Sequence, residues 1–234
     1  MAGVRQVAFA PGRRLLVTAT EREVVAVALD RPRAAGAGLR IRAPGAVTIA
    51  VSPGGGTLAL AGRVALPRAT LGAWDLDRGV KAWTAAAFGA AVAAWVDPYL
   101  LAVAGRELRL YSYEGAALPA AGAPRGQPIE AVAAQPDAIV TAFRGAVATV
   151  WDPGSVTPSA TLPVPAGAGK CLALGARTLA AGTVRAGGAV ALVDRGRRVV
   201  DRVLLGMRAA AFADPWLVVT GRAGTAVFAW DPDG

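Results

Sequence analysis

The chain of 234 residues carries 25 basic and 16 acidic side chains, a formal net charge of +9, and 54% of its residues are hydrophobic. Its 29 glycines and 16 prolines argue against long helices, because both residues are unfavourable inside helices, and favour short strands joined by tight turns. The absence of histidine excludes Ser-His-Asp and Cys-His nucleophiles and histidine-containing zinc sites, while the single cysteine excludes an internal disulfide and cysteine-rich zinc sites.

The basic charge comes almost entirely from arginine, because Lys81 and Lys170 are the only lysines. A guanidinium group stays charged and presents a planar fork of donors that suits phosphates and carboxylates, so an anionic partner is chemically reasonable. A GC-rich genome would favour arginine over lysine as well. Both explanations of the arginine excess remain open.

The composition and the N-terminal residues give information on the source organism's habitat and on the protein's location in the cell. The chain has no asparagine, three glutamines, two methionines and one cysteine, a depletion of thermolabile residues typical of hyperthermophile proteins. The N-terminus MAGVRQVAFAPGRR reaches Pro11 before an apolar run develops and predicts no secretory signal. Apolar residues 83–96 are too few for a spanning helix, which needs about 20, and are interpreted as two strands and a loop. We therefore expect a cytoplasmic thermophile protein without membrane insertion.

Similar segments recur along the chain about every 40 residues, the spacing of repeat architectures. Each segment ends in Asp or Ser after a large apolar residue. The copies are VAVALD ending at Asp30, LGAWD at Asp75, LRLYS at Ser112, ATVWD at Asp152, VALVD at Asp194 and VFAWD at Asp231.

Further apolar runs surround every copy. A short run such as LLVTA from Leu15 or LAVAG from Leu101 lies upstream, and it is preceded by another run that ends in a turn, such as QVAFAPG or AAFADP. Runs such as LRIRA and VKAWTA follow the copies. Units of 40 to 45 residues with four strands joined by turns are typical of propeller blades, whose inner strands are apolar on both faces because the blades stack radially.

The predicted fold is therefore all-β, a six-bladed β-propeller forming a single domain over residues 1–234. The repeats cover approximately residues 4–44, 45–86, 87–124, 125–165, 166–206 and 207–234. The first five continue into a fourth strand, whereas the sixth has no residues left to form one. We therefore expect a three-stranded, open last blade whose edge could accept a partner's strand.

The segments VRQVAFAPGRRLLVTATEREVVAVALD and MRAAAFADPWLVVTGRAGTAVFAWDPDG resemble blades of the WD-repeat β-propeller family, and the resemblance extends over nearly the whole chain. True Trp-Asp pairs occur at Trp74, Trp151 and Trp230. The family's Gly-His dipeptide is absent, so its buried hydrogen-bond network through that histidine cannot exist here. The resemblance implies a broad, rigid face for interactions. It also implies that the N-terminus supplies the strand that closes the last blade, as is usual in this family, but residues 1–4 are too few to form such a strand here.

Three motifs suggest chemistry at first sight. Asp75-Leu76-Asp77 and Asp231-Pro232-Asp233 could bind a hard cation or divide acid and base roles, but they occupy the repeat position where a strand turns, so we interpret them as turns. VPAGAGKC, residues 164–171, lacks the first glycine of a phosphate loop and is interpreted as an interblade loop. Cys171 begins an apolar strand and is expected in the core. No catalytic, metal or cofactor site is predicted.

An arginine follows the second predicted strand of every repeat. In a propeller these turns point the same way, so the side chains would form a ring that favours an anion such as phosphate, nucleic acid or an acidic protein segment. Glu21, Glu23 and Glu107 could neutralise parts of it; solvated turn residues are the alternative interpretation. The ring comprises Arg22, Arg63, Arg106, Arg144, Arg185 and Arg222.

A second basic cluster falls in turns of the opposite face. Its electrostatic character suits nucleic acid, but the expected stacking platform is missing, because Trp74, Trp151 and Trp230 are better explained as core residues. The cluster comprises Arg13, Arg14, Arg31, Arg33, Arg78, Arg177, Arg195, Arg197 and Arg198.

The predicted function is a non-enzymatic protein-interaction scaffold. The alternative is an RNA- or anion-binding module that uses the arginine ring. An enzyme with its site at the channel mouth would need carboxylates there, where the predicted turns carry mostly arginine. Because a fold does not determine function, the sequence leaves the partner's identity open.

Overall fold

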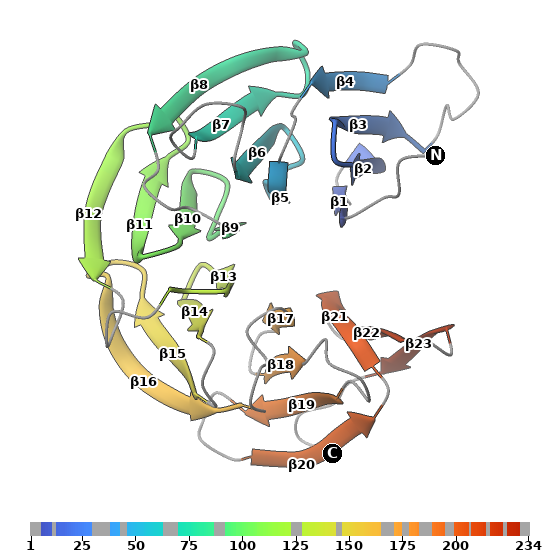
Figure 1. Ribbon diagram of the computed structural model, residues 1–234, viewed down its shortest axis with the longest axis vertical. Helices are drawn as coiled ribbons and strands as arrows, with labels where there is room; N and C mark the ends of the chain where they lie inside the picture. The colour runs from blue at the N-terminus through green and yellow to red at the C-terminus, as the bar shows by residue number, and fades with distance from the viewer. Residues whose placement is uncertain are drawn as a thin grey trace. The chain divides into compact units, whose positions relative to one another are not determined.

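The computed structural model is dominated by β-strands, and its described residues contain no α-helix (Figure 1). Within this part of the chain, no helix is long and apolar enough to cross a membrane. The described residues are 6–10, 13–29, 38–42, 46–62, 70–86, 92–122, 128–143, 147–164, 171–174, 178–182, 189–194, 199–205, 207–213, 216–221 and 224–229.

The chain divides into two compact units, Met1–Ala120 and Ala121–Gly234. The first contains three four-stranded antiparallel sheets, each built from consecutive strands: β1-β2-β3-β4, β5-β6-β7-β8 and β9-β10-β11-β12. Its strands are β1 (Gln6–Ala10), β2 (Leu15–Ala19), β3 (Glu23–Ala28), β4 (Gly38–Arg42), β5 (Ala46–Val51), β6 (Thr57–Gly62), β7 (Thr70–Asp75), β8 (Val80–Ala86), β9 (Val92–Trp95), β10 (Leu100–Ala104), β11 (Glu107–Ser112) and β12 (Ala117–Gly122).

The second unit contains two four-stranded sheets, β13-β14-β15-β16 and β17-β18-β19-β20, and the three-stranded sheet β21-β22-β23. Its strands are β13 (Ala131–Gln135), β14 (Ala138–Ala142), β15 (Val147–Asp152), β16 (Thr157–Pro163), β17 (Cys171–Leu174), β18 (Thr178–Gly182), β19 (Ala189–Asp194), β20 (Val199–Leu205), β21 (Met207–Ala213), β22 (Trp216–Gly221) and β23 (Gly224–Ala229).

The all-β prediction is confirmed, including strands in both halves of the apolar residues 83–96, which contain the end of β8 and all of β9. In the described residues the last sheet has three strands, as expected. Six blades in one closed domain, with an open last blade, stay predictions.

Burial decreases from the second strand of a sheet to the fourth. All of β14 is buried, as is β10 except for Leu100, whereas most of β16 is exposed. A strand that is apolar on both faces needs cover on both sides, and a four-stranded sheet supplies none by itself. The neighbouring sheets of each unit provide this cover.

Apolar side chains fill the spaces between neighbouring sheets. Val17 and Val24 of the first sheet pack in one cluster with Leu58 of the second, and Leu71 of the second lies in another with Leu101 of the third. A third cluster joins the two four-stranded sheets of the second unit. The core is therefore distributed over several seams between sheets.

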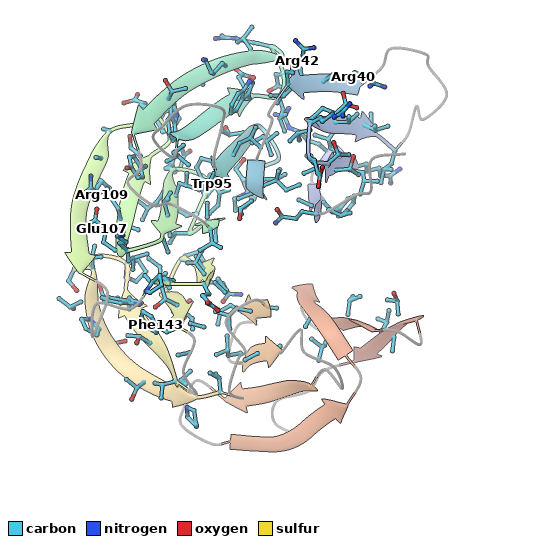
Figure 2. The ribbon with its side chains drawn as sticks, viewed as in Figure 1. Arg40, Arg42, Trp95, Glu107, Arg109 and Phe143 are labelled. Carbon is cyan, nitrogen blue, oxygen red and sulfur yellow. The ribbon has the colours of Figure 1, made fainter. Side chains whose placement is uncertain are left out.

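Three side chains also cross these seams to bond the backbone of a neighbouring first strand. Gln6 of β1 uses both ends of its amide on Ile49 of β5: its Oε1 accepts from the backbone N–H at 2.8 Å, and its Nε2 donates to the carbonyl at 3.3 Å. The buried Trp95 of β9, labelled in Figure 2, donates to the carbonyl of Ala50 at 3.1 Å.

In the second unit, Gln135 of β13 donates to the carbonyl of Leu174 in β17 at 3.0 Å. Two of the chain's three glutamines thus reach across a seam and form hydrogen bonds with backbone groups that the sheet's own strand pairing leaves unpaired. A side-chain amide suits this role because it carries both a donor and an acceptor.

The substitution Gln6→Met tests the importance of this seam. It keeps the side-chain volume similar but leaves the backbone amide of the buried Ile49 without its partner, so we expect a loss of about 1–3 kcal/mol in the free energy of unfolding in urea. Gln135→Met removes one hydrogen bond and should cost about 0.5–1.5 kcal/mol. Unchanged stability of Gln6→Met would contradict the proposed role of the amide.

Candidate interaction surface

Two members of the predicted arginine ring lie in the described part of the chain, both in the first unit. Arg22 lies in the turn between β2 and β3, and Arg106 in the turn between β10 and β11. Both are exposed and occupy the same position in sheets with the same strand order. Arg63, Arg144, Arg185 and Arg222 lie outside the described residues, so the complete ring stays a prediction.

Side-chain and backbone hydrogen bonds shape the two turns. The Thr20 hydroxyl oxygen accepts hydrogen bonds from the backbone N–H groups of Arg22 and Glu23 at 3.3 and 3.1 Å. In the other turn, the backbone N–H of Gly105 donates to the carbonyl of Glu107 at 3.1 Å. Each arginine is therefore presented by a tight turn at the end of a buried strand pair.

Two of the three carboxylates expected to neutralise the ring, Glu23 and Glu107, form ion pairs with other arginines. Glu23 lies 3.3 Å from the guanidinium of Arg40 on β4, and Glu107 lies 2.5 Å from that of Arg109 on its own strand; Figure 2 labels these two arginines and Glu107. Among the described residues, no carboxylate forms an ion pair with Arg22 or Arg106. Glu23 and Glu107 therefore form ion pairs with arginines of the strands, and the expectation that the three glutamates neutralise parts of the ring stays a prediction.

Three members of the second basic cluster are described: Arg13, Arg14 and Arg78. Arg13 donates to the carbonyl of Gly54 at 3.3 Å and also pairs with the carboxylate of Asp77, so it links the first sheet to two turns of the second. The Arg78 guanidinium lies 3.8 Å from the carboxylate of Asp75. Two of the three described members are therefore paired with carboxylates.

The remaining members of that cluster, Arg31, Arg33, Arg177, Arg195, Arg197 and Arg198, lie outside the described residues. Arg14 is exposed and has a positive φ of 47°. Its carbonyl accepts a hydrogen bond from the backbone N–H of Leu29 at 2.8 Å, which fixes the start of β2 against the end of β3.

The Arg13–Asp77 pair makes stability depend on pH. The hydrogen bond from Arg13 lowers the pKa of Asp77 below its ordinary value of 3.8, and the same contact raises the pKa of Arg13. A carboxyl group whose pKa is lower in the folded state stabilises the fold above its unfolded pKa, and this stabilisation is lost as the pH falls through the folded pKa.

We therefore expect Asp77→Asn to be less stable than the wild type at pH 7, and the difference to shrink as the pH falls below 3.8 through the lowered pKa of folded Asp77, measured by urea unfolding from pH 7 into the acid range. Because both side chains are largely exposed, about 1 M salt should shrink the difference at pH 7. A difference that does not change between pH 7 and the acid limit would contradict this prediction.

The first acidic pair is a structural turn, as predicted. One oxygen of Asp75 accepts hydrogen bonds from the backbone N–H groups of Asp77 and Arg78 at 2.8 and 3.0 Å. Asp152 occupies the equivalent position in the fourth sheet and accepts from the backbone N–H of Ser155 at 2.8 Å, a bond that lowers its pKa. The recurrent Asp thus caps the turn between the third and fourth strands.

This turn ends in the left-handed region of φ. Gly79 and Val156, each four residues after the capping Asp, have φ values of 66° and 52°, and Gly115, three residues after Ser112, has 90°. A β-branched residue is strained in this conformation, and burial of the Val156 side chain offsets that strain. The second acidic pair, Asp231 and Asp233, lies outside the described residues.

The other chemical motifs give no site in the described part of the chain. Cys171 opens strand β17, as predicted, and a strand at this point does not fit a phosphate loop, which requires a helix. The preceding residues 165–170 and the burial of Cys171 lie outside the description. The described residues contain no group of three or more Cys, Asp and Glu side chains placed to hold a metal ion.

A pair of exposed aromatic side chains lies on the third sheet, and the sequence analysis missed it. Tyr99 in the turn after β9 is 68% exposed, and Tyr113 in the turn after β11 is 48% exposed. Their ring centroids are 5.8 Å apart in an edge-to-face arrangement with an interplanar angle of 72°. We refer to Tyr99, Tyr113 and the adjacent Glu114 as the aromatic surface.

A tightly packed indole supports this surface from the second sheet. Trp83 of β8 stacks on the buried Tyr111 at 6.1 Å, and its indole N–H donates to the carbonyl of Tyr113 at 2.6 Å. It also covers Gly115, where an added Cβ would come within 2.7 Å of the ring. Glycine is therefore required here by both the indole and the positive φ.

A signal for the aromatic surface does exist in the sequence. Tyr99 follows Asp97-Pro98, and Tyr113 precedes Glu114-Gly115, so both tyrosines lie inside turn motifs. Turns lie on the surface, and a large aromatic residue in a turn is hence a candidate for exposure. The pattern is missed when only tryptophans are considered as exposed aromatic residues.

Comparisons with known proteins identify the architecture. Neither a protein-family model nor a curated protein matches the sequence. Among solved structures, a chain from "Structure of U3-55K" matches with a TM-score of 0.76 and 13% identity, over 97% of this chain and 77% of that one. The RRP9 WD40 repeats match with a TM-score of 0.76 and 14% identity, over 97% and 76%.

The chain has the fold of a WD-repeat-like β-propeller. The β-propeller domain of Cps50 (Swd1) from Myceliophteria thermophila also matches, with a TM-score of 0.62 and 13% identity over 99% of this chain and 98% of that domain. In total 1302 solved chains match. A likeness shared so widely at such low identity establishes the fold and identifies no single function.

The tryptophans of the described Trp-Asp pairs pack in the protein although the chain has no histidine to bond with them. Trp151 is buried, and its indole N–H donates to the hydroxyl oxygen of the buried Thr141 at 2.8 Å. Trp74 is half-buried and packs over Gly72, where a Cβ would come within 2.7 Å of its ring. The core role predicted for tryptophan is confirmed for Trp151 and holds in part for Trp74; Trp230 lies outside the described residues.

Proposed function

We propose that this protein is a non-enzymatic, cytoplasmic protein-interaction scaffold. The observation that carries the proposal is that some polar turn residues stabilise their own turns whereas others are left exposed. Asp75 and Asp152 are used to cap turns, whereas Arg22, Arg106 and the tyrosines of the aromatic surface are exposed on rigid supports. Recognition needs such presented side chains, and catalysis would need uncommitted acids or bases gathered together.

The fold supports this proposal by analogy. One of the similar solved chains, with a TM-score of 0.76 and 12% identity, belongs to a structure titled as a mitotic checkpoint complex. Stacked sheets that share seams hold their turns in fixed positions, and a fixed surface loses little conformational entropy on binding.

A second candidate function is anion or RNA binding through the arginine ring. The pairing of Glu23 and Glu107 with strand arginines favours it, because that pairing leaves the neighbouring Arg22 and Arg106 without a described carboxylate partner. Phosphate contacts would make such binding fall steeply with salt. The sequence-derived ring supplies the remaining positive charge for this candidate.

The two functions are separated by one capture experiment with tagged protein in a lysate of the source organism, with and without nuclease. A scaffold retains the same proteins after nuclease, and Arg22→Glu with Arg106→Glu leaves most of them bound. RNA that is retained at low salt and lost with this double variant would support the second function instead. Asp77→Asn serves as a charge-changing control away from the ring.

The edge of β23 is proposed as a further docking place for a partner's strand. In the described residues β23 pairs with β22, and Val227 on it is 60% exposed. A strand edge with unpaired backbone groups accepts another strand readily. In the same capture experiment, Val227→Lys should remove any protein held at this edge, and unchanged retention of every protein would contradict edge docking.

We also propose a thermophilic origin, supported by the depletion of thermolabile residues. The purified protein is then expected to unfold with a calorimetric midpoint above about 90 °C. A midpoint of about 45–65 °C, the usual range of mesophile domains, would contradict this origin.

A further inference from the structure

The aromatic surface has more exposed aromatic area than its environment requires. Tyr111, two residues before Tyr113, is 2% exposed and stacks on Trp83, whereas Tyr99 and Tyr113 are 68% and 48% exposed. An apolar ring left in water is unfavourable unless something else covers it. Exposed tyrosines held on a rigid support are typical of the central residues of protein interfaces.

Backbone hydrogen bonds hold the two tyrosines in place. The N–H of Tyr113 donates to the carbonyl of Tyr99 at 2.8 Å, and the N–H of Tyr99 donates to the side chain of Asp97 at 2.6 Å. With the bond from Trp83 to the Tyr113 carbonyl, three contacts fix the surface from three elements. Little conformational freedom remains to be lost when a partner binds.

The local charge is negative although the chain as a whole carries +9. The turns that hold Tyr99 and Tyr113 contain Asp97 and Glu114 and no basic residue. The Tyr113 hydroxyl donates to the Glu114 carboxylate at 3.0 Å, and this bond raises the pKa of Tyr113. A tyrosine phenol is protonated at neutral pH, and this hydrogen bond holds the carboxylate beside the ring.

A cation fits this combination of groups. The face of an aromatic ring attracts cations, and a carboxylate at the ring edge adds a second, directional attraction. A guanidinium group satisfies both at once, because it stacks flat on a ring while its N–H groups point outward to an acceptor. Nucleic acid fits less well, since Asp97 and Glu114 would repel its phosphates.

We propose that the aromatic surface binds an exposed arginine side chain of a partner protein, stacked on Tyr99 or Tyr113 and hydrogen-bonded to Glu114. The inference rests on the proposed scaffold function and names the chemistry of one docking place. It is independent of the arginine ring, which would attract groups of the opposite charge.

The three tyrosines of the chain make a direct test possible. Protein labelled with 3-fluorotyrosine gives three fluorine resonances, which are assigned with single Tyr→Phe variants. The probe is the blocked peptide Gly-Gly-Arg-Gly-Gly, titrated to about 10 mM because an isolated cation–π contact at an exposed site is weak. The matched peptide carries citrulline, which has nearly the shape of arginine but no charge.

We expect the arginine peptide to shift the resonances of Tyr99 and Tyr113 and to leave that of the buried Tyr111 unchanged. Citrulline should produce no comparable shift. Glu114→Gln should weaken the arginine effect about two- to fivefold, the value of an exposed ion pair, whereas Asp77→Asn, the same charge change on the neighbouring sheet, should leave it unaltered.

Equal shifts with citrulline, or an undiminished response of Glu114→Gln, would overturn the proposal. So would shifts of Tyr99 and Tyr113 with a thymidine oligonucleotide in the absence of a response to the arginine peptide, which would indicate base stacking. These outcomes leave the scaffold function itself intact, because the capture of proteins by the whole chain is measured separately.

Discussion

The structure depends on the seams between neighbouring sheets. The second strand of a sheet is buried on both faces, as β14 shows, so the sheet is stable only when a neighbour covers it. Apolar clusters provide most of that cover, and the amides of Gln6 and Gln135 satisfy backbone groups that no ladder reaches. Stability and surface geometry are therefore set together, because the seam that buries the strands also fixes the turns at their ends.

Some polar residues of the turns stabilise the turns themselves, and others are exposed to solvent where a partner could contact them. The carboxylate oxygens of Asp75 and Asp152 accept hydrogen bonds from backbone N–H groups. These bonds give each turn a defined shape and make the two acids unsuited to catalysis. Arg13 adds a link from one sheet to the turns of the next. On this rigid framework Arg22, Arg106, Tyr99 and Tyr113 project into solvent, so two surfaces of opposite chemical preference can coexist in one unit.

Much of the fold could be predicted from the sequence, because apolar runs and turn residues recur at a constant spacing and each repeat must solve the same burial problem. The capping role of Asp75 followed from its position in that repeat. The seam contact of Gln6 could not be predicted, since it joins β1 to a residue 43 positions away through a single side chain. The positive φ of Val156 was equally hidden, because its equivalent in the second sheet is the glycine Gly79.

The candidate site was harder to predict than the fold. The arginine ring was inferred from position alone, and position did not reveal that Glu23 and Glu107 would pair with Arg40 and Arg109 on the strands. The aromatic surface required knowledge of which turns lie beside each other, since Tyr99 and Tyr113 meet only through the pairing of β10 with β11 and the indole of Trp83. Contacts across strands and seams decide such sites, and a one-dimensional pattern does not record them.

The central claim is that the seams hold the exposed turns rigid, and amide hydrogen exchange at Tyr113 tests it most directly. This N–H lies in an exposed turn but donates to the carbonyl of Tyr99, and the carbonyl of Tyr113 accepts from the indole of Trp83. We expect it to exchange as slowly as the amides of the neighbouring strand β11, because it opens only when the surrounding structure does. Exchange at the rate of an unstructured peptide would contradict the claim.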